Sequence, residues 1–341
     1  MTLASPFPYF GGKRRAAPII WDALGDPGGY VEPFAGSAAV LLARPPFVGR
    51  RVETLNDADG WLVNTWRAIQ LSPDEVARHC AGPVTEIDYH ARLAWLQARR
   101  DADLVAWLEG DPEHHDAKAA GWWLYVVACG IGDPWGSGPW QVVDGHLRNI
   151  GNAGQGVNRE LPHLAAGRGV HRQLPHFGNA GQGVNRELPH LGNAGQGVNP
   201  DKTSPLQMYM QALAERLSDV RITCGDWTRV VTRATTRATR GGDGSIGILL
   251  DPPYSTSGDL YAHVDADVSH AVRDWCMTAD ASLRIVLCGF EDDHDALLAR
   301  GWRKVQGRAG GSGYSTNPKA HKRERLWLSP ACRGAQMELG L

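Results

Sequence analysis

The sequence lacks the patterns that mark several classes of protein. Its six cysteines are scattered without a Cys-x-x-Cys pair, so we expect neither a disulfide framework nor a metal site, and a reducing cytoplasm as the compartment. The amino-terminal segment MTLASPFPYFGGKRR lacks the charged-then-apolar order of a secretion signal. The longest largely apolar stretch, from Trp122 to Gly132, is too short to span a bilayer. These absences predict a cytoplasmic protein with no membrane partner.

Neither sign of charge dominates the chain. Its 341 residues hold 35 Lys and Arg against 37 Asp and Glu, which excludes the strongly basic balance of a histone-like protein. Any surface that binds nucleic acid must therefore be a local patch. Hydrophobic residues make up 43% of the chain, enough to build one large core or two of ordinary size.

Both ends of the chain show the alternation of strands and helices that is typical of a parallel α/β sheet. Residues 28–45 are consistent with a strand, a turn and the start of a helix, and residues 52–57 with a second strand followed by a helix. The pattern resumes with an amphipathic helix over 205–219. The further expected elements are strands at 220–224, 246–250, 283–287 and 325–328, and a helix near 267–280.

Residues 72–204 interrupt this pattern. Ser72-Pro73-Asp74-Glu75 is a favourable helix start, and the pattern stays helical to about Trp123. Within 91–109, large apolar side chains fall along one side, namely Leu93, Leu96, Leu104, Trp107 and Leu108. We therefore expect 1–71 and 205–341 to form the two halves of one core, with 72–204 inserted between them.

An internal repeat fills the end of this insertion. The segment GNAGQGVNRELPHL occurs at 151–164 and again, unchanged, at 178–191. The repeats within 151–199 are rich in glycine and poor in aromatic residues, so we expect surface turns and short extended pieces. Gln155, Asn158 and Arg159 are residue types that read base edges, although a tolerated surface loop is the alternative.

The tetrapeptide Asp251-Pro252-Pro253-Tyr254 carries the strongest chemical signal. It directly follows the apolar run IGILL, which places it at the carboxyl end of a strand, where open α/β sheets bind ligands. The two prolines supply no N–H, so nearby backbone carbonyls are able to face a ligand. A carboxylate and a free carbonyl together accept both hydrogens of an aromatic amine, and the tyrosine ring offers a face for a base to stack on. The alternative is an ordinary Asp-Pro turn.

With YFGGK at 9–13 and VEPFAGSA at 31–38 far upstream, this motif resembles the N6-adenine DNA methyltransferases of the Dam type, which are common in bacteria and phages. The order of motifs is similar to that of the subgroup in which the cofactor motif comes first and DPPY last. The resemblance covers about 1–70 and 205–330. It implies a Rossmann-like, S-adenosylmethionine-dependent methyltransferase sheet, with 72–204 as an inserted target-recognition region that is mainly helical and rich in loops.

The same resemblance implies an activity and roles for single residues. The activity is methyl transfer from S-adenosylmethionine to adenine N6 of double-stranded DNA after base flipping, as in restriction-modification. The implied catalytic residues are Asp251, Pro252 and Tyr254. The implied cofactor-binding residues are Tyr9, Lys13, Glu32, Phe34, Gly36, Ser37, Asp57, Asp226, Trp227 and Asp251.

Several of these residues have structural alternatives. Asp57 suits ribose hydroxyls but could instead cap the next helix. Trp227 could pack on the adenine ring of the cofactor or in the core. The segment around Lys13 could be a flexible basic terminus. At one position of the cofactor loop this sequence departs from the family, which often has a second glycine where Ala38 stands here.

Basic residues form two patches that contacts with DNA phosphates would explain. The first is a set of arginines at helical spacing, Arg229, Arg233, Arg237 and Arg240. The second, near the carboxyl terminus, is opposed only by Glu324 and comprises Arg303, Lys304, Arg308, Lys319, Lys322, Arg323 and Arg325. A solvated face is the alternative for each patch.

Two other functions stay open on the sequence. One is methylation of another planar amine, such as cytosine N4 or an RNA base. The other is a catalytically silent DNA-binding or decoy protein built on the same scaffold.

Overall fold

The computed structural model describes residues 3–7, 12–46, 49–82, 84–99, 104–129, 140–143, 146–149, 204–241, 243–253, 268–307 and 323–334. The chain divides into two compact units. We call Met1–Thr2, Gly11–Val63 and Asp219–Leu341 the sheet unit, and Leu3–Phe10 and Asn64–Ser218 the helical unit. The repeats at 151–199 lie outside the described residues. None of the helices described is both long and apolar enough to cross a membrane.

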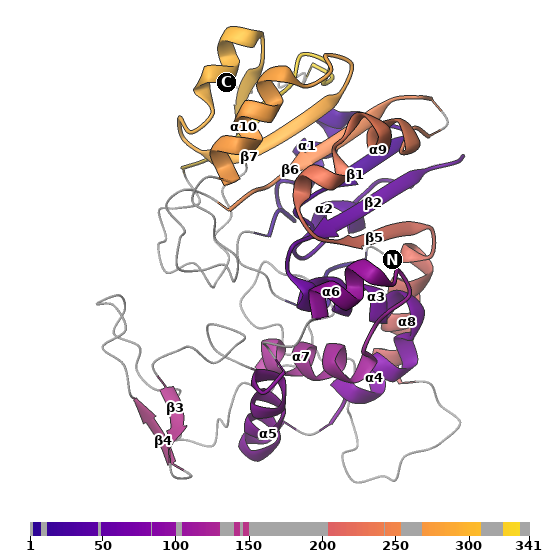
Figure 1. The fold of residues 1–341 in the computed structure, drawn as a ribbon, viewed down its shortest axis with the longest axis vertical. Coiled ribbons are helices and arrows are strands. Elements are labelled where there is room, and N and C mark those ends of the chain that lie inside the picture. The colour runs from indigo at the N-terminus through magenta and orange to yellow at the C-terminus, as the bar shows by residue number, and fades with distance from the viewer. Residues whose placement is uncertain are drawn as a thin grey trace, which may run out of the picture. The chain divides into compact units, whose positions relative to one another are not determined.

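A seven-stranded, mostly parallel sheet organises the sheet unit (Figure 1). Its order is β5-β2-β1-β6-β7-β9-β8, and only β9 runs antiparallel to the other strands. The expected α/β class is thus confirmed as a mixed sheet compatible with a Rossmann-like fold. The strands are β1 (Gly29–Glu32), β2 (Val52–Asp57), β5 (Val220–Cys224), β6 (Ile246–Leu250), β7 (Arg284–Phe290), β8 (Arg303–Gln306) and β9 (Glu324–Leu328).

The apolar runs predicted most of these strands. All five residues of β6 are buried, because a central parallel strand is covered on both faces. The expected strands at 52–57, 220–224 and 246–250 agree with β2, β5 and β6, whereas β7 continues three residues further than expected. Strand β8, with the sequence RKVQ, was not expected. It lies at the edge of the sheet and is only half-buried, so its sequence carries no apolar run.

Helices cover both faces of this sheet. Adjacent residues of a strand point to opposite faces. On β1, Tyr30 packs against Trp21 of α1, whereas Val31 belongs to a core that also contains Val272 of α10 and Leu297 of η2. The helical segments assigned wholly to this unit are α1 (Ala17–Leu24), α2 (Ala39–Leu42), η1 (Trp227–Val230), α9 (Arg233–Ala238), α10 (Val268–Thr278) and η2 (Asp295–Arg300).

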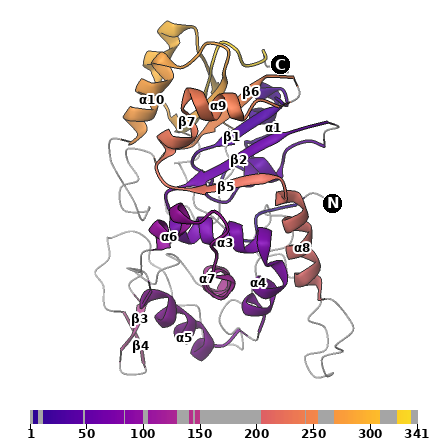
Figure 2. The same cartoon turned by 45° about the vertical axis from the view of Figure 1, so that its right-hand side comes forward.

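The helical unit contains most of α3 (Gly60–Leu71), four further helices before residue 130, helix α8 and a two-stranded hairpin (Figure 2). Phe7 packs its ring against Trp66 and Trp123. The remaining elements are α4 (Pro73–Cys80), α5 (Glu86–Gln97), α6 (Leu104–Gly110), α7 (Ala117–Cys129), β3 (Trp140–Val143), β4 (His146–Asn149) and α8 (Pro205–Leu217).

The helical expectation for 72–123 is met, but the apolar side expected over 91–109 is not continuous. These residues belong to two helices, α5 and α6. Within α6, Leu108 is buried whereas the neighbouring Trp107 side chain is 63% exposed. The periodicity of the sequence thus placed Trp107 on the wrong side, although Leu104, Trp107 and Leu108 all belong to α6.

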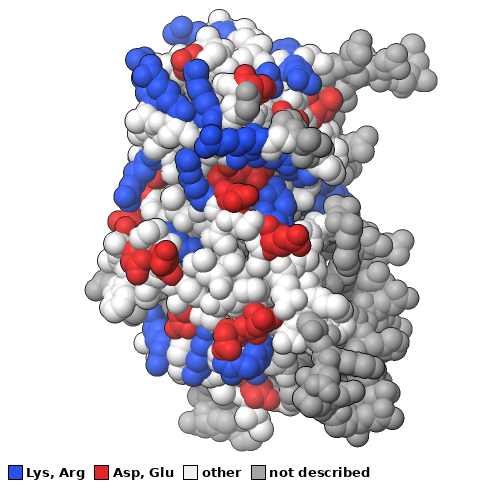
Figure 3. Space-filling model, turned by 90° about the vertical axis from the view of Figure 1, so that its right-hand side faces the viewer, with Lys and Arg blue, Asp and Glu red and all other residues white. Residues whose placement is uncertain are grey.

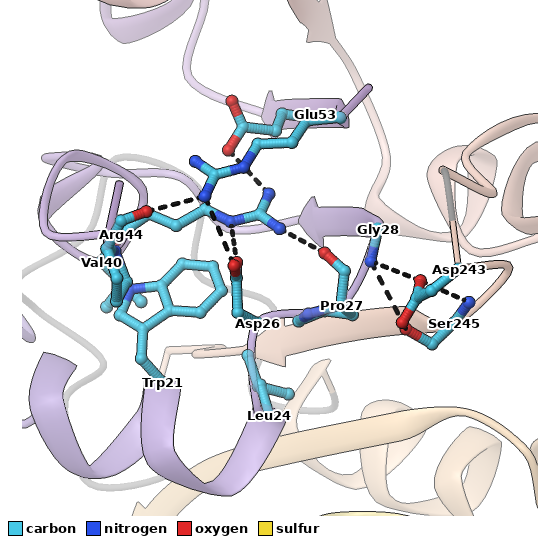
Figure 4. Close-up of polar contacts among 12 residues, drawn as sticks. Trp21, Leu24, Asp26, Pro27, Gly28, Val40, Arg44, Glu53, Asp243 and Ser245 are labelled. Carbon is cyan, nitrogen blue, oxygen red and sulfur yellow. Dashed lines mark hydrogen bonds and ion pairs between the residues drawn. The ribbon is translucent and has the colours of Figure 1, made fainter. Parts of the chain in front are cut away.

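The buried side chain of Arg44 connects the amino-terminal ends of β1 and β2 in the sheet unit (Figure 4). The fully buried Arg44 side chain forms ion pairs of 2.8 Å with Asp26 Oδ1 and with Glu53 Oε1 on β2. It also donates a hydrogen bond to the carbonyl oxygen of Pro27, and its guanidinium lies 5.0 Å from the ring centre of Trp21. The Arg44 side chain therefore joins the segment before β1 to the neighbouring strand.

Replacing this arginine should destabilise the protein strongly. In Arg44→Met, Glu53 would remain a buried carboxylate without its cation, which typically costs about 3–5 kcal/mol of unfolding free energy. Urea unfolding followed by circular dichroism measures the change. Arg78→Met is the control, because Arg78 and its partner Glu75 are both well exposed. Equal midpoints for the two variants would show that the buried pair contributes nothing.

Candidate functional site

The order of strands reverses between β1 and β6. From β1 the chain proceeds through β2 to β5 on one side, and from β6 through β7 on the other. Rossmann-like sheets bind their ligands in the crevice outside the carboxyl ends of the strands at such a point. Here β1 ends at Glu32, and β6 ends one residue before Asp251. Two of the acids expected from the sequence therefore flank the reversal point.

A buried lysine connects Asp251 to a third acid. Lys13 Nζ lies 2.8 Å from Asp251 Oδ2 and 2.9 Å from Glu324 Oε1. The Lys13 side chain is 5% exposed, against 21% for Asp251 and 18% for Glu324. Burial alone would lower the pKa of Lys13, but the two carboxylates raise the pKa well above its usual value. Lys13 is therefore a permanent cation in this site.

A thiol also contacts Asp251. Cys288, on β7, is fully buried and donates a hydrogen bond to the Asp251 carboxylate. Burial raises the pKa of this thiol well above its usual value, and the charge of Asp251 raises it further. Cys288 therefore stays protonated and able to donate. Sequence reasoning missed both Cys288 and the pairing of Glu324, since neither belongs to a recognisable motif.

Glu32 is the most strongly perturbed acid of the site. Burial raises the pKa of Glu32 to about 8, with smaller upward effects from the Asp251 and Asp57 carboxylates. Hydrogen bonds from Tyr30 Oη, at 3.1 Å, and from the backbone N–H of Leu41 act in the opposite direction. At neutral pH Glu32 therefore holds its proton for most of the time.

Asp57 holds the loop that follows β1. Its Oδ2 accepts a 2.9 Å hydrogen bond from the backbone N–H of Gly36, and its Oδ1 accepts one of 3.0 Å from Asp59. Burial raises the pKa of Asp57 to about 6. The backbone N–H of Trp61, at the start of α3, is bonded by Asp59, 2.8 Å away. The alternative of a helix cap thus applies to Asp59, and Asp57 faces the loop.

The same loop has a left-handed backbone at two positions. Gly36 has φ +45°, and Ala38 has φ +49° just before α2. A residue with a side chain is strained by about 1–2 kcal/mol in this conformation, whereas glycine adopts it freely. This strain is a physical reason for a second glycine at the position of Ala38. Ser37 lies between these residues and is buried.

Asp226 and Trp227 follow β5 but differ in their surroundings. Asp226 is exposed and accepts hydrogen bonds from the backbone N–H of Thr228, at 2.9 Å, and from its hydroxyl. Trp227 is 7% exposed, stacks on Phe34 with 6.0 Å between ring centres and meets Trp275 edge-on. Trp227 is thus a core residue. Phe34, which is half-buried, leaves more of its ring accessible in the loop.

The exposed arginines after β5 do not all lie at this end of the sheet. Arg229 comes shortly after the carboxyl end of β5. By contrast, Arg240 lies near the amino end of β1, because its chain neighbours Thr239 and Gly241 lie against Gly29 and Gly28. The set therefore runs from one end of the sheet to the other. Figure 3 shows a face on which Lys and Arg side chains gather, with a few Asp and Glu among them.

In the second patch, Arg323 is already engaged within the protein. Its Nε lies 3.3 Å from Glu291 Oε2, and its guanidinium lies 5.3 Å from the ring centre of Phe290. Five residues with expected roles lie outside the described part of the chain, namely Tyr9, Tyr254, Arg308, Lys319 and Lys322.

Comparison with known proteins adds no assignment to this site. The sequence matches no family of known proteins and no curated protein. Within the described ranges, no three His, Cys, Asp or Glu side chains are grouped so that they could hold a metal ion.

The raised pKa of Glu32 predicts a pH-dependent stability. Between about pH 5 and pH 8 the carboxyl is protonated in the folded protein and ionised in the unfolded chain. Stability then falls with rising pH by up to about 1.4 kcal/mol per pH unit. Glu32→Gln removes this titration. The melting temperature of the variant relative to the wild type should therefore rise from pH 5.5 to pH 8.

Asp22→Asn serves as the control, because Asp22 is exposed on α1. Its melting temperature relative to the wild type should be the same at both pH values. If Glu32→Gln behaved like this control, Glu32 would be ionised in the folded protein across the whole range.

Proposed function

We propose that this protein is an S-adenosylmethionine-dependent DNA methyltransferase that modifies the N6 amine of adenine. The observation that carries the proposal is the place of Asp251. Its carboxylate directly follows the buried strand β6 at the point where the strand order reverses, is partly accessible and lies beside Glu32 and Lys13. The resemblance of the sequence motifs to Dam-type enzymes supplies the identity of the reaction.

The acids around the reversal point suit a cationic ligand. Burial raises the pKa of Glu32 to about 8 and that of Asp57 to about 6, so a cation placed nearby would favour the ionised form of both carboxyl groups. S-adenosylmethionine carries a sulfonium and an ammonium group and, when bound, supplies an electrophilic methyl group. Glu32 would balance its positive charge, Asp57 would bind its ribose hydroxyls, and the backbone of the loop at Gly36 would lie against it. A ligand of this charge would relieve the repulsion among the carboxylates.

Asp251 would act on the target amine. Its carboxylate would accept one N–H of the amine, and the carbonyl oxygen of Pro252 would accept the other, which turns the nitrogen lone pair toward the methyl group. Tyr254 would provide the stacking surface implied by the motif. An adenine must leave the duplex to reach this position, as in other enzymes that modify bases. Positioning of this kind is able to supply roughly 7–11 kcal/mol of the rate enhancement.

DNA would be held through phosphate contacts and by the helical unit. We assign Arg229 to the phosphate contacts nearest the site, since it follows the carboxyl end of β5. Arg233 and Arg237 would continue them along α9. The helical unit, which includes the whole region expected to recognise the target, would provide sequence specificity.

The first test replaces Asp251 by asparagine. Asp251→Asn keeps the shape of the side chain but removes the charge that orients the amine, so methyl transfer to adenine in duplex DNA should fall at least 100-fold. Transfer is measured with isotope-labelled S-adenosylmethionine and mass spectrometry of the nucleosides. Calorimetry should show cofactor affinity within severalfold of the wild type.

Asp22→Asn is the matched control, because this exposed acid lies on α1 and has no part in the proposed contacts with cofactor or DNA. It should keep full activity. Expression in a methylation-free bacterium, followed by modification-sensitive sequencing, would report the base and the site. A wild-type protein that binds DNA but not the cofactor would be a silent DNA-binding protein, and methylated cytosine or RNA would identify the other substrates.

Cofactor binding should also release protons. A cation placed near Glu32 favours its ionised form, so binding at pH 7 should release a substantial fraction of one proton and should strengthen from pH 6 to pH 8. Calorimetry in buffers of different ionisation enthalpy measures this number. Glu32→Gln should bind with less proton release, and an unchanged release would place the cation elsewhere.

A further inference from the structure

Among the described residues, the Lys13 ammonium forms ion pairs with two carboxylates, and the proposed function uses one of them. Asp251 would meet the target amine, whereas Glu324 has no role in that description. Yet Glu324 lies as close to the ammonium as Asp251 does, at 2.9 Å against 2.8 Å. Both carboxylates are mostly buried, so their interactions with Lys13 are weakly screened by water.

We infer that Glu324 is a positioning residue for Asp251, acting through Lys13, an inference that rests on the proposed function. Glu324 and Asp251 both pair with the Lys13 ammonium, so the attraction between Lys13 and Asp251 is weaker than it would be without Glu324. It also gives the ammonium a partner when Asp251 turns to a target amine.

The balance of donors around Asp251 explains why such sharing is needed. The Asp251 carboxylate already accepts from Lys13 and from the Cys288 thiol, and it must also accept an N–H of the target. A carboxylate has about four acceptor positions and an ammonium has three donors. The target amine would therefore be a third donor to this carboxylate, and it would compete with Lys13 for its negative charge rather than for an acceptor position. A lysine with no second partner would resist release, because a buried cation without a carboxylate is strongly unfavourable.

The fold fixes Glu324 in this place. It is the first residue of β9 and pairs in register with Phe290, the last residue of β7, two residues after Cys288. Its backbone is thus set by the sheet ladder. Lys13 lies just before α1. It forms ion pairs with Asp251, which follows the end of β6, and with Glu324, at the start of β9.

The kinetic test uses Glu324→Gln, which removes the charge and keeps the shape. The kcat for methyl transfer should fall about tenfold, with the Kd of S-adenosylmethionine changed less than twofold. Glu324→Asp, which retains the charge, should recover part of the loss. Glu291→Gln is the control, because this acid pairs with Arg323 on the surface nearby and should leave kcat unchanged. When Lys13 is already replaced by methionine, the additional change Glu324→Gln should cause no further fall in kcat.

A second measurement does not depend on activity. Asp251→Asn should lower the melting temperature more in Glu324→Gln than in the wild type, because only the double variant removes both carboxylates that pair with Lys13, at 2.8 and 2.9 Å. The inference would be overturned if Asp251→Asn lowered the melting temperature equally in both backgrounds. It would also be overturned if the falls in kcat caused by Lys13→Met and by Glu324→Gln multiplied in the double variant. A further outcome is that the wild type transfers no methyl group while the effects of Asp251→Asn and Glu324→Gln on the melting temperature still depend on each other. In that case the proposed function would be wrong, but the pairing of Lys13 with both carboxylates would be supported.

Discussion

The parallel pairing of β1 with β6 is the constraint on which the site depends. Gly29 pairs with Ile246 and Val31 with Ile248, so segments more than 200 residues apart in the chain become neighbours. Because both strands point the same way, their carboxyl ends reach the same edge of the sheet. That is why Glu32 and Asp251 influence each other although no local pattern links them. At the opposite end, the backbone N–H of Gly28 donates a hydrogen bond to Asp243 and so joins the segments before β1 and β6. The ion pairs of Arg44 join the segment before β1 to β2.

The charges at this edge are arranged at the expense of stability. A buried carboxyl with a pKa of about 8, beside two other acids, is a group that folding leaves in an unfavourable environment. Strongly perturbed acids are concentrated at functional sites, where a ligand supplies the missing opposite charge. Among the described residues, Lys13 is the cation that pairs with Asp251 and Glu324. In the proposed function, the cationic cofactor would add a second positive charge near Glu32.

Sequence patterns predicted the sheet better than they predicted the contacts of the site. The runs IGILL and VRITC identify buried strands because their burial depends on composition, whereas β8 escaped prediction as a half-exposed edge strand. The motifs also singled out Asp251, Glu32 and Asp57, and the fold brings these three acids near one another. The motifs left Trp227 open between core and ligand, and the structure places it in the core against Phe34 and Trp275. That choice depends on tertiary packing, which no single segment encodes.

Glu324 illustrates a limit of the rule that ligands lie at the carboxyl ends of strands. The rule directs attention to residues that follow a strand, and it therefore finds Asp251 after β6 but not an acid at the start of β9. An antiparallel strand begins where its parallel neighbours end, so its first residue reaches the same edge as their last. In the sequence, Glu324 stood out only as the single acid in a basic segment. Its pairing with Lys13 can be recognised only once the direction of β9 is known, because that direction brings the Glu324 carboxylate to the Lys13 ammonium.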